Sequence, residues 1–138
     1  MTRTAFPMSL ALAVALAAPA AARQPETEVD RRLSAEFAAC IEREPSTAGM
    51  RECTSAEYVR QDRALNETYQ RALGQLNARQ AARLRTAQRA WVAYRDARCA
   101  SLADQDWGTL SLLSASSCTL TMTVERLIDL EDYPPGGG

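Results

Sequence analysis

Polar residues with a potential for chemistry recur among apolar ones at helical spacing in the middle of the chain. They are Asp62, Asn66, Gln88, Trp91 and Arg95. A carboxylate among apolar side chains needs hydrogen-bond donors, and an indole N–H or a guanidinium can provide them. No two of these groups are arranged for general acid–base catalysis. We therefore interpret the set as a structural polar network, with a ligand-binding site as the alternative.

The residue types that are missing restrict the chemistry further. The chain of 138 residues contains no histidine and no lysine. This excludes a Ser-His-Asp triad, a Cys-His pair, a histidine-bound metal, a Schiff-base lysine and a phosphate-loop lysine. Carboxylates are plentiful, but no spacing indicates the facing pair of a glycoside hydrolase. The sequence predicts a protein that is not an enzyme and that uses no cofactor and no metal.

The N-terminal residues have the pattern of an export signal. Arg3 provides a positive charge, and an apolar run of about 11 residues ends before a small-x-small pattern at Ala22. A membrane anchor needs about 18 to 20 apolar residues, so we expect cleavage after Ala22 and no anchor in the periplasmic or secreted product. The predicted division is a signal peptide at 1–22, a loose lead-in at 23–28, a helical domain at 29–132 and a disordered tail at 133–138.

Four cysteines fit an exported domain. They are Cys40, Cys53, Cys99 and Cys118. An even number in a small exported chain predicts two disulfides, whereas a zinc site would favour C-x-x-C spacing, which is absent. Because each pair flanks an expected turn between helices, we favour Cys40 with Cys53 and Cys99 with Cys118. The competing pairing joins Cys53 to Cys99.

The apolar pattern predicts an all-α fold, since alternating runs of β-branched residues are absent. We expect a first helix over 29–43, a second from a Thr47 cap to about residue 73, and a third to about residue 102 that begins at an Asn77 and Gln80 capping box. A fourth helix follows a loop at 104–108. The fold class is a small disulfide-stapled helical bundle built on an antiparallel helical hairpin.

The second and third helices are expected to form that hairpin and to bury their inner faces on each other. A single long rod is the alternative, because no proline interrupts residues 50–102. The hairpin would place Asp62 opposite Trp91 and Arg95, and Asn66 opposite Gln88. The inner face of the second helix is predicted to consist of Tyr58, Asp62, Leu65, Tyr69 and Leu73, and that of the third of Leu84, Gln88, Trp91, Arg95 and Cys99.

Charge is distributed unevenly, although the formal net charge is only −1. Residues 78–98 carry six arginines and one acid, whereas residues 99–138 carry one arginine and six acids. Mutual attraction of the two packed segments is the structural explanation. The functional alternatives are an anion-binding arginine face and an acidic face for a cationic partner, while nucleic acid is not expected. The arginine face would consist of Arg79, Arg83, Arg85 and Arg89.

An aromatic residue within the acidic region suggests where a protein partner would bind, since aromatic anchors are common in interfaces. For Trp107 the alternative role is to cover the end of the bundle. The candidate partner-binding residues are Asp104, Asp106, Trp107, Asp129 and Asp132.

Two segments carry a resemblance to a known family. DRALNETY at 62–69 and QRAWVAYRDARC at 88–99 resemble the exported bacterial family named after the mycobacterial lysozyme inhibitor LprI, over about residues 40 to 130. The resemblance implies an exported, cysteine-containing helical domain that binds and inhibits lysozyme without chemistry, with c-type lysozyme as the candidate partner. A general periplasmic binding or structural module for an anionic cell-wall component or a partner protein is the alternative.

The chain departs from the family pattern at two places. The founding member is a lipoprotein, whereas this chain has no cysteine near residue 22 to which a lipid could be attached. A Gly-Gly-Ser sequence that often precedes the last family cysteine is replaced by Asp-Trp-Gly-Thr at 106–109. The second departure puts in doubt a binding role inherited from the family for that loop.

Overall fold

The computed structural model describes residues 26–133, and this part of the chain is helical and contains no strand. The predicted signal peptide, residues 23–25 of the lead-in and residues 134–138 of the tail lie outside the described residues. The all-α prediction is confirmed. The elements are α1 (Glu28–Arg32), α2 (Ala35–Arg43), α3 (Thr47–Gly74), α4 (Ala78–Ala100), the short 3-10 helix η1 (Gln105–Trp107) and α5 (Thr109–Glu131).

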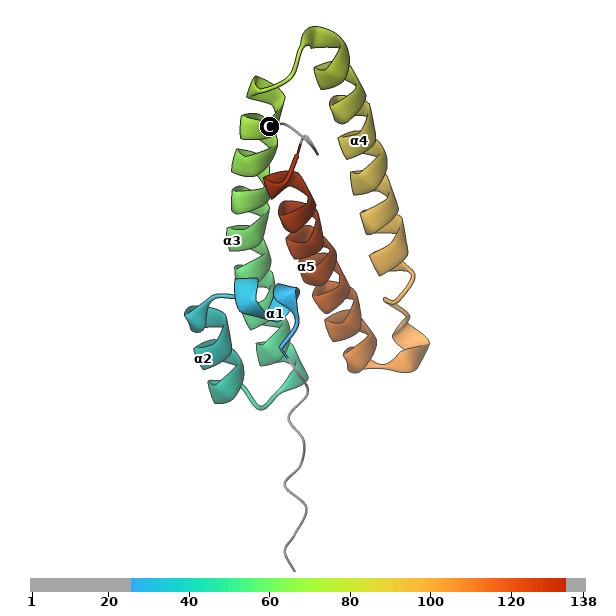
Figure 1. Cartoon of the computed structure of the whole chain (residues 1–138). Helices are drawn as coiled ribbons and strands as arrows, with labels where there is room; N and C mark the ends of the chain where they lie inside the picture. The colour runs from blue at the N-terminus through green and yellow to red at the C-terminus, as the bar shows by residue number, and fades with distance from the viewer. Residues whose placement is uncertain (1–25, 134–138) are drawn as a thin grey trace, which may run out of the picture.

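The two long helices α3 and α4 form the predicted antiparallel hairpin, so the single-rod alternative is wrong (Figure 1). The hairpin turns between Gly74 and Ala78. Asn77 Oδ1 accepts a hydrogen bond from the Gln80 backbone N–H at 3.0 Å, and Gln80 Oε1 accepts one from the Asn77 N–H at 3.0 Å. This reciprocal capping satisfies two backbone donors at the start of α4. It therefore fixes the residue at which the second helix of the hairpin begins.

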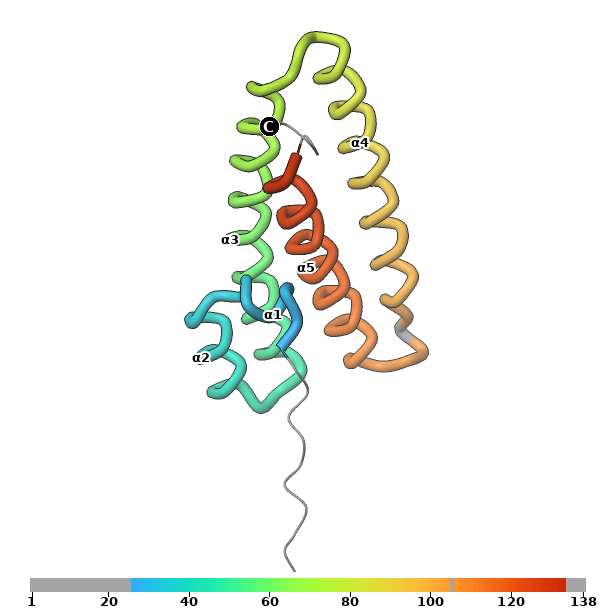
Figure 2. Tube along the Cα trace, viewed as in Figure 1, coloured from blue at the N-terminus to red at the C-terminus, as the bar shows by residue number. Residues whose placement is uncertain are grey.

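Helix α5 returns between the other two long helices and packs chiefly against α3 (Figures 1 and 2). The expectation that α3 and α4 bury their faces mainly on each other is therefore wrong. The buried core joins all three helices through Leu65, Ala72, Leu84, Leu127 and Leu130. Burial of these apolar side chains is the main favourable contribution to folding.

Because α5 packs against α3, the buried face of α3 differs from the predicted one. Tyr58, Asp62, Tyr69 and Leu73 are only half-buried, so they flank the core. Leu65 is buried as predicted. The stripe fully covered by neighbouring elements contains Cys53, Thr54, Glu57, Gln61, Leu65, Thr68 and Ala72.

The predicted first helix over 29–43 is divided into α1 and α2. Leu33 has an extended backbone, and Ser34 begins α2 by accepting a hydrogen bond from the Phe37 N–H at 3.1 Å. The serine hydroxyl also donates to Glu57 Oε2 at 2.6 Å. The division therefore follows from a contact with α3 that no local pattern reveals. The cap of α3 is likewise shifted by one residue, from Thr47 to Ser46.

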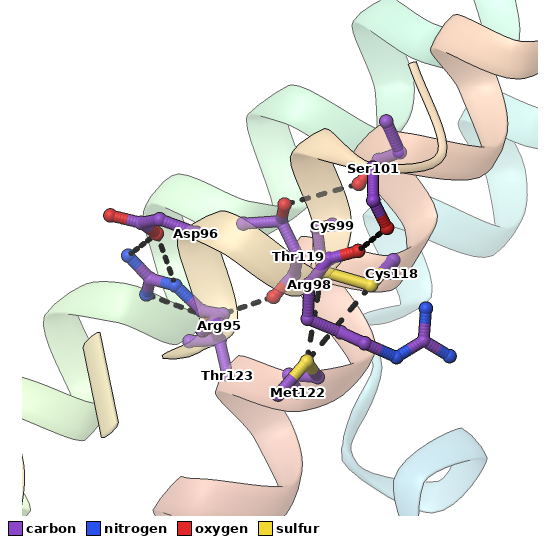
Figure 3. Close-up of a disulfide and its surroundings, with 10 residues drawn as sticks. Arg95, Asp96, Arg98, Cys99, Ser101, Cys118, Thr119, Met122 and Thr123 are labelled. Atoms are coloured by element: carbon purple, nitrogen blue, oxygen red, sulfur yellow. Dashed lines mark hydrogen bonds and ion pairs between the residues drawn. A yellow bond between two sulfur atoms is a disulfide. The ribbon is translucent and has the colours of Figure 1, made fainter. Parts of the chain in front are cut away.

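Two disulfides link neighbouring helices, and the preferred pairing is confirmed. Cys40 of α2 joins Cys53 of α3 with a Cα–Cα distance of 5.8 Å. Cys99 of α4 joins Cys118 of α5 at 5.5 Å (Figure 3). All four cysteines are thereby used, so the alternative Cys53 to Cys99 bridge and the four-cysteine zinc site are both wrong.

The two ends of the described chain are held by local contacts. Helix α1 begins at Glu28, at the last residue of the predicted lead-in, with Thr27 as its cap. At the other end, Tyr133, which was assigned to the tail, is half-buried and packs against the core. Among the described helices, none is both long enough and apolar enough to span a membrane.

Candidate functional site

Arg95 forms the centre of the polar network within the bundle. Arg95 is only 7% exposed, and its Nη1 atom lies 3.9 Å from Asp62 Oδ1 of α3 and 3.3 Å from Thr123 Oγ1 of α5. Its Nε donates to Asp96 Oδ1 at 2.9 Å. A guanidinium with a rigid set of five donors can satisfy several partners at once. Arg95 therefore links the three long helices through one buried cation.

The aromatic ring of Trp91 lies between two arginines from different helices. The guanidinium carbon of Arg95 is 5.0 Å from the Trp91 ring centre, and that of Arg126 on α5 is 5.9 Å from it. Arg95 also lies 5.7 Å from the ring centre of Tyr58. Cations at these distances are attracted by the electron-rich ring face. The structure thus brings Asp62, Trp91 and Arg95 together.

Asn66 and Gln88, by contrast, are not brought together. Asn66 Nδ2 donates to the backbone oxygen of Asp62 at 2.9 Å and to its Oδ2 at 3.0 Å, within α3. Gln88 Oε1 accepts a hydrogen bond from Arg126 Nε at 3.0 Å. Because α5 takes the place opposite Gln88, the direct α3 to α4 contact does not form. Among the described residues, no buried side-chain polar atom lacks a partner, which favours a structural role for the network.

Glu57 is a buried charge that the sequence pattern did not single out. The residue is 0% exposed. Its carboxylate accepts hydrogen bonds from the Ser34 N–H at 2.9 Å, the Ser34 hydroxyl at 2.6 Å, Gln61 Nε2 at 2.7 Å and Arg60 Nε at 2.7 Å. Burial raises the pKa of Glu57, but the bonds from Gln61, Ser34 and Arg60 outweigh burial and hold the pKa below its ordinary value of 4.5.

A signal for Glu57 does exist in the sequence. Glu57 follows Cys53 by four residues, so the two share one face of α3. Since Cys53 must face α2 to form its disulfide, that face is a buried one. The disulfide pairing, combined with helical periodicity, would have identified the carboxylate.

The loop between α4 and α5, together with the first turn of α5, exposes large apolar side chains at one end of the bundle. Trp107 is 65% exposed and Leu110 is 62% exposed, and we call these two residues the apolar tip. Asp106 beside them is also exposed, whereas Asp104 is half-buried and its Oδ1 accepts a hydrogen bond from the Asp106 N–H at 2.9 Å. Trp107 therefore does not cover the end of the bundle.

The loop that carries the apolar tip is anchored on both sides. Ser111 is buried, and its hydroxyl lies 2.7 Å from the backbone oxygens of both Asp104 and Gly108. Gly108 has a φ of 74°, a conformation that residues with a side chain rarely adopt. The Cys99–Cys118 disulfide then joins the helices on either side of the loop. These contacts connect the loop to both flanking helices.

The remaining predicted partner-binding residues lie far from the tip. Asp129 and Asp132 are exposed at the C-terminal end of α5, about 30 Å along the helix from its start at Thr109. Asp129 Oδ2 also lies 3.7 Å from Arg126 NH1. The structure therefore divides the predicted acidic set between opposite ends of α5, and these residues do not form one continuous face.

Four exposed arginines lie in the first half of α4, which follows the hairpin turn, whereas the apolar tip follows the other end of the helix. Within the described residues, none of them has a carboxylate within ion-pair distance. A hollow of about 400 Å³ lies beside Tyr69 and is lined by Arg85, Gln88 and Arg89. The exposed members of the arginine face are Arg79, Arg83, Arg85 and Arg89.

Comparison with known proteins gives a match over most of the described domain. The family model described as lysozyme inhibitor LprI matches residues 38–130, which include both disulfides, the Arg95 network and the apolar tip. A protein of Rhizobium meliloti (strain 1021), named only as uncharacterized, is 28% identical over 144 residues, which cover 94% of each chain. No solved structure matches.

Proposed function

Because the chain belongs to the lysozyme inhibitor LprI family, we propose that it binds a c-type lysozyme and obstructs its substrate cleft without performing chemistry. An inhibitor of this kind needs a stable, complementary surface and no catalytic group. The absence of histidine and lysine from the sequence agrees with that requirement. We further propose that residues 1–22 direct export and that the protein acts in the periplasm or outside the cell.

The apolar tip is the surface that we propose for the contact. The observation that carries this assignment is the exposure of Trp107 in η1 and Leu110 at the start of α5, each above 60%, beside the contacts of Ser111 and a disulfide. A large aromatic side chain at the centre of an interface often dominates its binding energy. A loop already held in its bound conformation loses little entropy on association.

Charge beside the tip supports the same partner. The exposed carboxylate of Asp106 adjoins Trp107 in the sequence, and residues 99–110 contain two acids and no basic residue. A cationic enzyme would be attracted to this end of the bundle, and charge complementarity mainly raises the association rate. We therefore expect binding to a cationic lysozyme to weaken as the salt concentration rises.

The proposal is tested with the oxidised protein purified after export, by titration against a c-type lysozyme. Cell-wall lysis and direct binding are followed together, at low and at physiological salt. We expect saturable binding with inhibition, and a loss of about tenfold or more in affinity for both Trp107→Ala and Leu110→Ala. Val59→Ala is the matched control, because Val59 is 55% exposed on α3 and is remote from the loop in sequence.

Two outcomes would contradict this assignment. Absence of both binding and inhibition at micromolar concentration would remove lysozyme as the partner. Binding that is unchanged in the two tip variants, but weakened by Asp129→Arg with Asp132→Arg, would move the contact to the other end of α5.

The second candidate function is recognition of an anionic cell-wall component through the arginine face of α4. Its support is the cluster of exposed arginines without carboxylate partners among the described residues, together with the hollow beside Tyr69. Such binding would depend strongly on salt. Binding to an anionic polymer that is lost in Arg85→Ala with Arg89→Ala, without any effect on lysozyme, would favour this function over inhibition.

A further inference from the structure

A groove runs along the outer seam between α4 and α5 and belongs to none of the surfaces considered above. Its volume is about 500 Å³. From α4 it is lined by Tyr94 and Arg98, and from α5 by Ser117, Thr121 and Glu125. The α5 side of the groove, from Ser114 to Glu125, extends about 16 Å along the helix. A short chain of linked rings would fit this length better than a single small molecule.

The disulfide makes the groove rigid. Cys118 and Met122 line the groove, and Met122 Sδ lies 3.6 Å from Cys99 Sγ and 3.9 Å from Cys118 Sγ (Figure 3). The covalent link holds the two helices at a fixed separation, with a Cα–Cα distance of 5.5 Å at the bridge. A ligand would therefore meet walls that are already in place, which lowers the cost of binding.

The polar side chains along the groove are not used by the fold. Three groups have no hydrogen-bond or ion-pair partner within the part of the chain that the structure describes. They are the Tyr94 hydroxyl, the Arg98 guanidinium and the Glu125 carboxylate. Arg98 and Glu125 line one groove without forming an ion pair with each other. The hydroxyls of Ser117 and Thr121 are similarly without a protein partner there.

We propose that this groove binds a short, neutral oligosaccharide. A sugar ring has C–H faces that stack on an aromatic ring, and Tyr94 is 59% exposed at the groove. Sugar hydroxyls both donate and accept hydrogen bonds. The groove matches them with a donor in Arg98, an acceptor in Glu125 and serine and threonine hydroxyls that do both.

Other ligand classes fit these groups less well. A polyanion would be repelled by Glu125, and it would find more positive charge on the arginine face of α4. A purely apolar ligand would take water from several polar side chains without replacing their hydrogen bonds. An extended peptide gains most from a sheet edge, and the described chain has none.

The test is an NMR titration of the whole exported protein with triacetylchitotriose, a neutral trisaccharide. We expect shifts of the backbone signals of the groove residues and a dissociation constant on the order of 1 mM or below. Tyr94→Ala should weaken binding at least tenfold, whereas Tyr94→Phe, which keeps the ring, should stay within about twofold. Thr121→Val, which keeps the shape and removes the hydroxyl, should weaken binding several-fold.

Val59→Ala is again the matched control, since it removes an exposed apolar side chain from α3, which does not line this groove. Unchanged spectra of residues outside the groove would show that each variant is folded. The proposal is overturned if about 10 mM sugar causes no shifts in the groove, or if Tyr94→Ala leaves binding unchanged. Tighter binding of a trisaccharide of uronic acids would also overturn it, because Glu125 should oppose an anion.

This inference does not rest on the proposed inhibition of lysozyme. The titration uses the protein alone, and none of the substituted residues belongs to the apolar tip. Tyr94→Ala should keep its affinity for lysozyme, while Trp107→Ala should keep its affinity for the sugar. The failure of either proposal is therefore distinguishable from the failure of the other.

Discussion

Among the described residues, two charged side chains are buried, Glu57 on α3 and Arg95 on α4, and each lies one helical turn from a disulfide cysteine. Glu57 follows Cys53 by four residues, and Arg95 precedes Cys99 by four. The two differ in their partners. Glu57 receives four hydrogen bonds and has no exposed surface, whereas Arg95 pairs with carboxylates that remain in contact with water.

Glu57 and Arg95 stabilise different parts of the fold. Glu57 holds the start of α2 at Ser34, so it orders a short helix that has no buried residues of its own. Arg95 joins long helices that are already packed through a shared apolar core. We infer that the region around α2 depends on its buried charge more than the three-helix core depends on Arg95.

The largest effect is expected for Glu57→Ala. Its removal leaves a cavity and deprives the half-buried Ser34 of its acceptor and the buried Gln61 of one of its two acceptors, at a cost of about 3–4 kcal/mol in the free energy of unfolding. Denaturant unfolding at neutral pH measures this cost. Glu67→Ala, which removes an exposed carboxylate from the same helix, should change stability by less than about 0.5 kcal/mol. Equal effects of the two substitutions would contradict the assigned role of Glu57.

Removal of either disulfide is expected to lower the free energy of unfolding slightly less than Glu57→Ala does. Replacing Cys40 and Cys53 by alanine, or Cys99 and Cys118, should each lower stability by about 3 kcal/mol, because cross-links over 13 and 19 residues restrict the unfolded chain to similar extents. Hydrogen exchange would sharpen the comparison. Loss of the Cys40–Cys53 disulfide should raise the amide exchange of α2 alone. If the amides of α2 stay protected without this disulfide, Glu57 suffices to hold the helix.

Arg95→Met should cost about 2 kcal/mol, less than Glu57→Ala. Methionine keeps most of the buried stem, and the remaining carboxylates of Asp62 and Asp96 have side chains 36% and 58% exposed, so water can satisfy them. Urea unfolding measures the loss. Arg98→Met, on the exposed face of the same helix, is the control. A cost larger than that of Glu57→Ala would reverse the proposed ranking of the two centres.

The smallest effect is expected from mild acid. Because the folded pKa of Glu57 lies below its ordinary value of 4.5, its contribution to stability is complete above that value and is lost as the pH falls through the folded pKa. Stability measured from pH 7 downward should therefore decline below about pH 4.5. Glu57→Gln should flatten this decline.

Part of the acid response should persist in that variant. The pKa of Glu28 is lowered by its hydrogen bonds from Arg31 and Arg32, and that of Asp30 by hydrogen bonds from Thr27. These groups are exposed, so their effect on stability is small. An acid response identical in Glu57→Gln and the unsubstituted protein would place the titrating group elsewhere.

Much of the local structure could be predicted from the sequence, because it depends on residues close together in the chain. The capping box at Asn77 and Gln80 requires only a spacing of three residues, and it correctly located the hairpin turn. The disulfide partners are 13 and 19 residues apart and flank turns, so the pairing followed from the helix pattern. The QRAWVAYRDARC segment likewise identifies the family without any knowledge of the fold.

The functional assignments depended more on tertiary structure. The acidic residues are close in the sequence, but α5 is a helix of 23 residues and separates Asp104 and Asp106 from Asp129 and Asp132 by about its own length. The groove beside Tyr94 exists only because α4 and α5 are side by side at the disulfide. A surface made by two helices cannot be derived from the pattern of either one.

The sequence by itself determined an all-α, disulfide-linked chain, its hairpin turn and its family, since short-range hydrogen bonds and helical periodicity carry this information. Only the tertiary structure decided that α5 lies between α3 and α4 and that Asp62, on the predicted inner face of α3, is only half-buried. The physical reason is that a helix offers several faces of similar character, and which of them is buried depends on the competition among all its neighbours for apolar contact.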